Sequence, residues 1–388
     1  MKQIKTTGNL FVVNTPHQLL NATEAVHTFQ LTNNHLLVVR PRNDAQDRFK
    51  ALINLSDWAT VSFPLLSLEP NYDVQKRLSP AANRWYCRYV HFRKVRALAK
   101  VVARFQRVDK LFLGHDSVQW APFMRHLANT IRHNTLYLLD DGTDTIGIIE
   151  NRHRSERRVR EAPVDERNAR PSVRKTLLGR LRAKYWDLHL AEAPCVTFFT
   201  IYDLTVGQSD MLIKNNYSYL RSLAPPENSY MRDAVIFIGL CSTDKCFEIN
   251  SYLKFLSGVK EYFYPNKMIY VAHPRDSASS VMQIREHLQC ELWPSGSVIE
   301  YDLIIQGTRP KAIAGFVSSA LITLAHLMDA DVEIVCFQIA QENWVSWRED
   351  AVGVYDYIKR KAHGRVSVVP LSLQREHANR SDLDTISR

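Results

Sequence analysis

The sequence has no long apolar run, and this excludes several classes of protein. None of its 388 residues belongs to a stretch of about 18 apolar residues, so no candidate membrane-spanning helix is present. The first apolar patch, Leu10–Val13, is followed at once by Asn14, Pro16 and His17, which leaves it too short for the apolar core of a signal peptide. These absences predict a cytoplasmic protein.

Organised cysteines and the common nucleotide-binding motifs are also missing. The 6 cysteines are scattered and form no CxxC pair, so neither a disulfide framework nor a zinc cluster is expected. Most should be reduced and packed as small apolar side chains. No Walker sequence and no GxGxxG occurs, which argues against ATP hydrolysis and the common dinucleotide-binding fold.

Positive charge is concentrated in one segment. The formal net charge is +10 at pH 7, and residues 151–185 hold 12 Lys and Arg against 4 Asp and Glu. The first part of this segment has few apolar residues and contains Pro163 and Pro171. It therefore predicts a mobile arm or long loop, followed by a helix that starts near Ser172.

Several partners fit this basic arm. Residues 152–184 could lie on the anionic inner leaflet of a membrane, which would make the protein peripheral on the inner face of the inner membrane. The arm could instead attract an acidic substrate, or be a solvated loop with a local charge bias. Nucleic acid is not expected, because no aromatic residue precedes Tyr185 to provide a stacking surface.

The order of apolar and amphipathic segments predicts an α/β protein. Short apolar strands at 10–13, 35–39, 110–113 and 135–139 alternate with helical patterns, which is typical of a parallel sheet with helices on its faces. A polar stretch with Pro225, Pro226 and Asn228 precedes a second series of the same kind. We therefore expect two Rossmann-like domains, residues 1–228 and 229–388, that face a central cleft.

Polar residues follow several of these strands. Ligands of parallel α/β sheets bind outside the carboxyl ends of the strands, so these residues are the candidates for a site. They are Thr15, Asp140, Asp141, Gly239, His273, Ser318 and Ser319.

The acidic pair Asp140–Asp141 precedes Gly142. It lacks the alternating acids of an EF-hand, and Leu139 stands where a haloacid dehalogenase phosphatase would need an aspartate. Two adjacent carboxylates at a strand end suit a general base, with one facing the ligand and its neighbour bonding backbone amides. An Asx turn that merely ends a strand is an equally good interpretation.

The second half offers candidate phosphate contacts. His273–Pro274 ends a strand, and its imidazole could bond a phosphate oxygen or act as an acid at neutral pH. Ser318 and Ser319 precede a helix whose N-terminus could bind phosphate, and Gly239 would allow a ligand to approach the backbone closely. A turn histidine and simple helix capping are the structural alternatives.

Together these motifs resemble a known group of enzymes. The chain is similar to the bacterial sialyltransferases of glycosyltransferase family 52 and to the related bacterial polysialyltransferases. The resemblance rests on Asp140–Asp141–Gly142, then His273–Pro274, then Ser318–Ser319, in that order. The sequences FVVNTPHQLL at 11–20 and VAHPR at 271–275 also look similar, and the resemblance extends from about residue 10 to residue 340.

This resemblance implies a GT-B fold and an inverting transfer of sialic acid from CMP-sialic acid, with no metal and no cofactor. The acceptor would be a hydroxyl of an acidic or lipid-linked bacterial surface glycan: lipooligosaccharide, capsule or O-antigen. Asp140 would be the general base, with Asp141 as second choice, and His273 would assist the departure of CMP. The remaining expected contacts are Gly239, Pro274, Glu300, Ser318 and Ser319 on the donor, with Thr15, Gln18 and Gly142 lining the cleft.

Two other functions stay open at the level of the sequence. A CMP-Kdo-dependent Kdo transferase would share the fold, the base, the histidine and the leaving group. A non-catalytic glycan-binding or capsule-assembly protein could keep the fold without needing the acidic pair for chemistry.

Overall fold

The chain divides into two compact units. A computed structural model describes residues 8–39, 46–64, 77–116, 121–161, 188–240, 246–294, 296–346, 348–362 and 364–371. The units are Met1–Leu220 and Arg221–Arg388, called the N-terminal and C-terminal units below. The sequence analysis places the boundary a little later, after residue 228.

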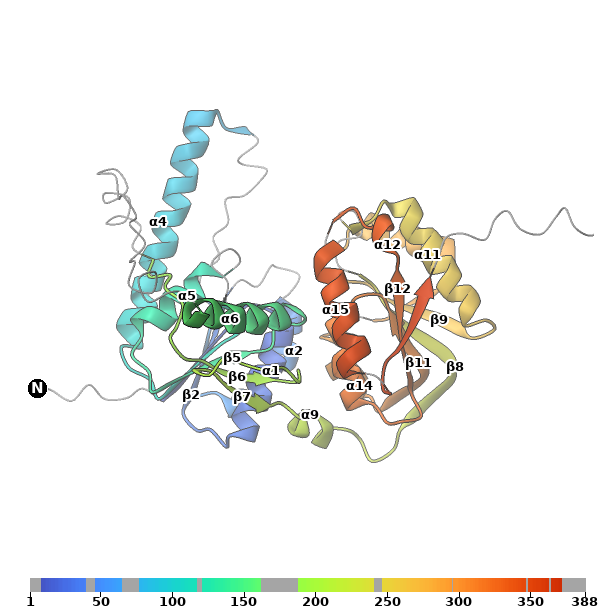
Figure 1. Cartoon of the computed structure of the whole chain (residues 1–388), viewed down its shortest axis with the longest axis horizontal. Coiled ribbons are helices and arrows are strands. Elements are labelled where there is room, and N and C mark those ends of the chain that lie inside the picture. Colours follow the sequence, from blue (N-terminus) through green and yellow to red (C-terminus); the bar gives the residue numbers. More distant parts are fainter. Residues whose placement is uncertain are drawn as a thin grey trace, which may run out of the picture. The chain divides into compact units, whose positions relative to one another are not determined.

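The N-terminal unit is built on a 7-stranded sheet in the order β3-β2-β1-β4-β5-β6-β7 (Figure 1). All pairs in it are parallel. The strands are β1 (Asn9–Val13), β2 (Asn34–Val38), β3 (Thr60–Ser62), β4 (Lys110–Leu113), β5 (Thr135–Leu139), β6 (Thr197–Thr200) and β7 (Met211–Lys214). The helices are α1 (Pro16–Thr28), α2 (Gln46–Leu52), α4 (Pro80–Arg104), α5 (Pro122–Thr130), α6 (Asp144–Glu161) and α9 (Ser218–Ser222), with a 3₁₀ turn at Leu55–Asp57.

Aromatic residues in register hold the centre of this sheet. Phe11 of β1 stacks on Phe112 of β4 with 4.2 Å between ring centroids, and Phe112 stacks on Tyr137 of β5 at 4.4 Å. Their neighbours Leu10 and Val12 point to the opposite face and are equally buried. Burial on both faces explains why the central strands are continuous apolar runs.

The C-terminal unit repeats this plan with a 6-stranded parallel sheet in the order β10-β9-β8-β11-β12-β13. Its strands are β8 (Ser229–Ile238), β9 (Lys267–Val271), β10 (Glu291–Leu292), β11 (Thr308–Gly315), β12 (Glu333–Ile339) and β13 (Ser367–Leu371). Its helices are α11 (Ile249–Tyr262), α12 (Ala278–Leu288), α13 (Ile299–Ile305), α14 (Ser319–Leu327) and α15 (Arg348–Lys361), with a 3₁₀ turn at Gln341–Asn343.

Each sheet has a point at which the strand order reverses. In the N-terminal unit it lies between β1 and β4, and in the C-terminal unit between β8 and β11. The helices that leave neighbouring strands there go to opposite faces, which opens a crevice at the carboxyl ends of the strands. Two Rossmann-like parallel-sheet units confirm the predicted α/β class.

The prediction of a basic arm over 151–185 is wrong for its first part. Residues 151–161 continue helix α6, and Arg152 is buried rather than solvated. Its guanidinium donates to both carboxylate oxygens of Asp210, at 2.9 and 2.7 Å. Residues 162–187, including the helix expected near Ser172, lie outside the described residues. Within the described residues, no helix is both long and apolar enough to span a bilayer.

Candidate active site

The crevice of the N-terminal sheet begins at the end of β1. Thr15 caps helix α1, and its hydroxyl accepts a hydrogen bond from the Gln18 N–H at 3.2 Å, while Pro16 occupies the first helical turn. The Gln18 side chain is buried, and its Oε1 accepts from the Asn14 N–H at 2.8 Å. Gly114, at the end of β4, leaves room for this side chain, because a Cβ there would lie 2.0 Å from Oε1. Thr15 and Gln18 therefore lie beside the reversal point of the sheet.

Asp140 follows β5 and is buried, with 1% of its surface exposed. Its Oδ2 accepts a hydrogen bond from the Ile201 N–H at 2.8 Å, whereas its Oδ1 has no hydrogen-bond partner among the residues that the structure describes. The Asp140 carbonyl accepts from the Asn21 side chain at 3.2 Å, and Asn21 is itself held by Tyr217 at 2.6 Å. One carboxylate oxygen is thus fixed and the other is left for a ligand.

Burial raises the pKa of Asp140 from its ordinary value to about 6. The Thr200 hydroxyl, the Ile201 N–H and the nearby His17 oppose this increase, since each favours the charged carboxylate. A carboxylate with a pKa near the working pH is a better general base than an ordinary aspartate, because it binds the transferred proton more tightly.

Asp141 has different surroundings. Its side chain is 18% exposed, and its Oδ2 lies 3.6 Å from Nδ1 of His115, which follows β4. Gly142 has a φ of +64°, a left-handed conformation that strains any residue with a Cβ, so the turn after the acidic pair requires glycine. Asp141 is therefore the more accessible acid, and Asp140 is the one with the raised pKa.

Unpartnered polar atoms gather at this edge of the sheet. Buried polar groups normally have hydrogen-bond partners, and each one that lacks a partner needs an explanation. The atoms here without a hydrogen-bond partner in the described ranges are Asn14 Oδ1, Gln18 Nε2, His115 Nδ1 and Nε2, Asp116 Oδ2 and Asp140 Oδ1. They follow β1, β4 and β5, which are neighbours in the sheet. A ligand rich in hydroxyl groups would satisfy both the donors and the acceptors among them.

His115 and Asp116 are functional-site candidates that were not predicted from the sequence. They come one glycine after the strand at 110–113. Asp140 and Asp141 come in a similar place, directly after the next strand. Applying the strand-end rule to every strand would have found them. His115 is 5% exposed, so its ring is enclosed at the site rather than held at the surface.

The same edge holds side chains that could bind a metal ion. Ligand atoms of His115, Asp141 and Asp144 lie within 4.8 Å of one another. Asp144 begins helix α6, and the positive end of the helix dipole there favours anions over cations. The expectation that no metal takes part therefore stays a prediction, and these three residues are the ones on which to test it.

In the C-terminal unit, the expected donor contacts follow three adjacent strands. Gly239 follows β8, His273 follows β9 and Ser318 follows β11, and the order of these strands in the sheet is β9-β8-β11. A Cβ on Gly239 would lie 2.4 Å from the Tyr270 hydroxyl and 2.8 Å from the Val271 carbonyl. The glycine is thus required by the fold.

The surroundings of His273 determine its tautomer. Its Nδ1 accepts a hydrogen bond from the Arg275 N–H at 3.1 Å, and its backbone N–H donates to Asp276 Oδ2 at 3.2 Å. A neutral imidazole that accepts at Nδ1 carries its proton on Nε2. Pro274 stands between the two bonded residues in this turn, and Nε2 is therefore the nitrogen that carries the N–H.

The serines cap a helix, as the sequence suggests. Ser318 is the N-cap of α14, and its Oγ accepts from the Ala320 N–H at 3.3 Å. Ser319 is the first helical residue. Glu300 is a buried residue in the first turn of α13. Capping accounts for Ser318 by itself, so a role in phosphate binding stays a prediction, as does the donor contact of Glu300.

Comparison with protein families shows the group of enzymes to which this chain belongs. Residues 9–336 match the model of the family described as alpha-2,8-polysialyltransferase. The chain belongs to this family. It is therefore a glycosyltransferase of the sialyltransferase type, as the acidic motif, His-Pro and the serine pair suggested. No curated protein matches the sequence.

Solved structures with similar chains include other sialyltransferases. An alpha/beta-galactoside alpha-2,3-sialyltransferase from Photobacterium phosphoreum is 12% identical, with 94% of this chain and 99% of that chain covered and a TM-score of 0.46. A 2,6-sialyltransferase from Photobacterium sp. JT-ISH-224, solved with CMP and lactose, is 12% identical, with 94% and 78% covered and a TM-score of 0.48. The polysialyltransferase family match covers most of the chain and does not depend on these likenesses.

Proposed function

We propose that this sialyltransferase moves sialic acid from CMP-sialic acid to a hydroxyl of a bacterial surface glycan, with inversion at the anomeric carbon. The acceptor role is assigned to the N-terminal unit, with Asp140 as general base. The donor role is assigned to the C-terminal unit, with His273 and Ser318 as phosphate contacts. Family membership supports the donor, and the strand-end geometry supports the division of roles.

The proposed reaction is a single displacement. The acceptor oxygen forms a bond to the anomeric carbon while the bond from that carbon to the phosphate oxygen breaks. The acceptor proton goes to Asp140, and the electron pair of the broken bond leaves with CMP. A hydrogen bond from His273 Nε2 would stabilise the charge that grows on the phosphate. A sugar hydroxyl is a poor nucleophile, so the base contributes directly to the rate.

One observation carries the choice of Asp140. Its Oδ1 is buried and has no hydrogen-bond partner in the described part of the chain, and burial raises its pKa to about 6. A buried oxygen without a hydrogen bond costs the fold roughly 1–3 kcal/mol, which a catalytic role would explain. Asp141 is more exposed and remains the second choice.

The test compares Asp140→Asn with Asp141→Asn. The new amide in Asp140→Asn keeps an oxygen to accept from the Ile201 N–H, so the fold should be unaffected. We expect Asp140→Asn to lower kcat for sialyl transfer by about 10²–10⁴, the usual contribution of a general base, and Asp141→Asn to have a smaller effect. The opposite order would assign the base to Asp141. Full activity in both variants would exclude both carboxylates as the base. Absence of sialyl transfer by the unaltered protein would favour a glycan-binding protein without this chemistry.

The pH dependence gives an independent measurement. The base works only when it is deprotonated, so kcat/KM for the acceptor should fall about tenfold per pH unit below pH 6. An aspartate with its ordinary pKa would keep full activity down to about pH 4. A parallel assay of CMP release tests the donor: release from CMP-Kdo but not from CMP-sialic acid would replace sialic acid by Kdo in this proposal.

A further inference from the structure

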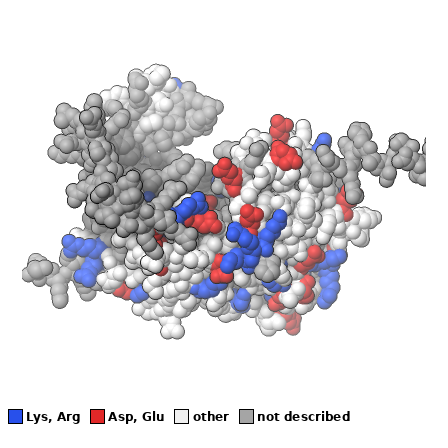
Figure 2. All heavy atoms as spheres, in the orientation of Figure 1, with Lys and Arg blue, Asp and Glu red and all other residues white. Residues whose placement is uncertain are grey.

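Helix α4 carries charge of one sign only. Its 25 residues, Pro80–Arg104, include 7 Lys and Arg and no Asp or Glu. Figure 1 shows that its N-terminal half extends beyond the sheet of its own unit. In Figure 2, by contrast, basic and acidic side chains alternate over the visible face of the C-terminal unit. An uninterrupted basic helix indicates an anionic partner.

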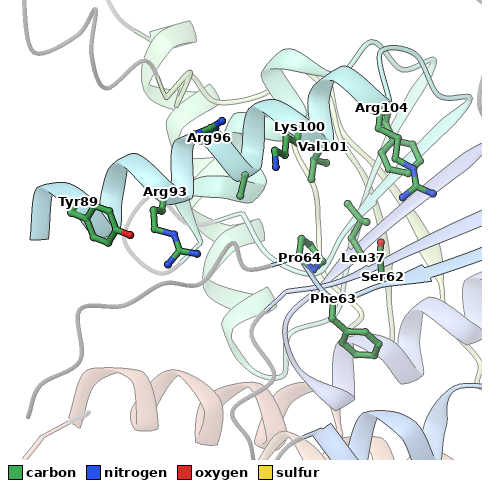
Figure 3. Close-up of a pocket in the computed structure, with 12 residues that line it drawn as sticks. Leu37, Ser62, Phe63, Pro64, Tyr89, Arg93, Arg96, Lys100, Val101 and Arg104 are labelled. Atoms are coloured by element: carbon green, nitrogen blue, oxygen red, sulfur yellow. The ribbon is translucent and has the colours of Figure 1, made fainter. Parts of the chain in front are cut away.

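A groove runs along this helix (Figure 3). Its volume is about 760 Å³, and Arg93, Arg96, Lys100 and Arg104 line it. Spacings of three and four residues place these four side chains along one side of the helix, over a length of roughly 16 Å at 1.5 Å per residue. The groove therefore presents a row of cations rather than a single one.

Within the described residues, the cations of this row lack acidic partners. No carboxylate in that part of the chain forms an ion pair with Arg93, Arg96 or Lys100. Arg104 donates to the Thr60 hydroxyl at 3.4 Å, and the Arg93 guanidinium lies 5.9 Å from the centre of the Tyr89 ring. Neither contact neutralises charge, so the row remains available to an anion.

Apart from Ser62, the rest of the groove is apolar or aromatic. Leu37, Val101 and Phe105 lie on its inner side and are buried. Along the same helix, Tyr89 and Trp85 are 57% and 71% exposed, which is unusual for such large rings. Aromatic rings beside arginines and lysines are typical of segments that lie at the interface of a membrane.

We propose that helix α4 docks on an anionic phospholipid bilayer, with lipid phosphates on the row Arg93–Arg104 and the exposed rings at the level of the headgroups. Exposed aromatic rings beside a row of cations match an amphiphile, which has an apolar part and an anionic part. A free acidic polysaccharide would satisfy the cations but would leave the large rings of Trp85 and Tyr89 exposed to water. This docking is a property of the helix and does not depend on the proposed chemistry.

Helix α4 projects toward the sheet edge that carries the proposed acceptor site. Leu37 and Ser62, which line the groove, lie near the carboxyl ends of β2 and β3, at the same sheet edge as Asp140. Helix α4 leads into β4, so its N-terminal half projects past this edge. A bilayer bound there would lie on the acceptor side of the sheet, which suits an acceptor anchored in lipid.

The test measures co-sedimentation of the full chain with phosphatidylcholine vesicles, with and without phosphatidylglycerol. The groove variant is Arg93→Gln, Arg96→Gln and Lys100→Gln. The matched control is Lys359→Gln, Arg360→Gln and Lys361→Gln in the last turn of α15, which removes the same charge elsewhere. We expect the groove variant to lose at least about tenfold in binding to the anionic vesicles, since three cations near the surface are removed, and the control to lose far less.

Other results would overturn the proposal. Equal loss in both variants would show that net charge alone drives binding. Unchanged binding in the groove variant would also overturn it. A soluble carboxylated polysaccharide serves as a second probe, and if only its binding depends on the groove, the ligand is a glycan instead. Turnover on a soluble acceptor should be unchanged in the groove variant, which separates this result from a failure of the proposed reaction.

Discussion

Asp140 and Asp141 are neighbours in the sequence but have different chemical surroundings. The carboxylate of Asp140 lies among the ends of β5 and β6, where burial raises its pKa to about 6. The carboxylate of Asp141 reaches the surface beside His115. The acidic motif alone could not distinguish them, because the difference arises from Ile201, far later in the chain, and from His115, well before the motif.

Gly239 offers a test at the same scale. We expect Gly239→Ala to destabilise the C-terminal unit by about 1–3 kcal/mol, because the new Cβ would overlap the Tyr270 hydroxyl and the Val271 carbonyl. Tyr270→Phe should rescue the variant only in part, since the contact with the Val271 carbonyl remains. Denaturant unfolding of the single and double variants measures both effects.

Gly147→Ala is the control for this substitution. Gly147 lies in helix α6, and a Cβ there meets nothing within 4 Å. This change should stabilise the protein by about 0.5–1 kcal/mol, because alanine loses less conformational freedom in a helix than glycine does. If both alanine variants had the same free energy of unfolding, the close contact at Gly239 would not destabilise the C-terminal unit.

At the scale of elements, helix α6 shows how composition can mislead. Residues 151–161 have few apolar side chains, so the sequence suggests a solvated arm. Arg152 is nevertheless buried, and its guanidinium bonds Asp210, Glu192 and the Ala193 carbonyl. These partners are 40 to 58 residues away, so a local pattern of charges does not reveal them.

The ion pair of Arg152 predicts a large effect of its removal. Arg152→Ala should lower the free energy of unfolding by roughly 3–5 kcal/mol, because it leaves the buried Asp210 carboxylate without its partner. Arg154→Ala, two positions later, should cost about 0.5 kcal/mol or less, since Arg154 is exposed and lies 3.7 Å from an exposed Glu150. Urea unfolding of the two variants gives the comparison, and similar losses would contradict a structural role for Arg152.

At the scale of the whole molecule, the expected residues divide between two sheets of the same design. The acidic motif belongs to the N-terminal unit, and His273 and the serine pair belong to the C-terminal unit. In both units the residues follow strands at or beside the reversal point of the sheet. Binding of the two substrates should therefore respond separately to variants in each unit.

Calorimetry with CMP tests this separation. We expect His273→Ala to weaken CMP binding by about 10- to 100-fold, the effect of losing one hydrogen bond to a charged group. Asp140→Asn should leave the CMP Kd within about twofold, because Asp140 belongs to the other unit and is assigned to the acceptor. Loss of CMP binding in the Asp140→Asn variant would contradict the assignment of Asp140 to the acceptor.

The fold could be predicted in outline because it depends on local patterns. The apolar runs around Phe11, Phe112, Tyr137 and Phe237 fall in buried central strands, and the residues that end those strands are visible in the sequence. The short strands β3, β6, β7, β10 and β13 were not predicted, since strands at or near the edge of a sheet have weaker apolar patterns. His115 was missed for a different reason, because its role depends on its neighbours in space.

The sequence by itself determined the class of protein. It specified two parallel α/β units, the order of the acidic, His-Pro and serine motifs, and the family to which they belong. Only the tertiary structure decided the state of each group: which aspartate is buried, which nitrogen of His273 donates, and which of the described cations lack acidic partners. Backbone pattern is a property of neighbouring residues, whereas pKa, tautomer and charge pairing depend on atoms that folding brings together from distant parts of the chain.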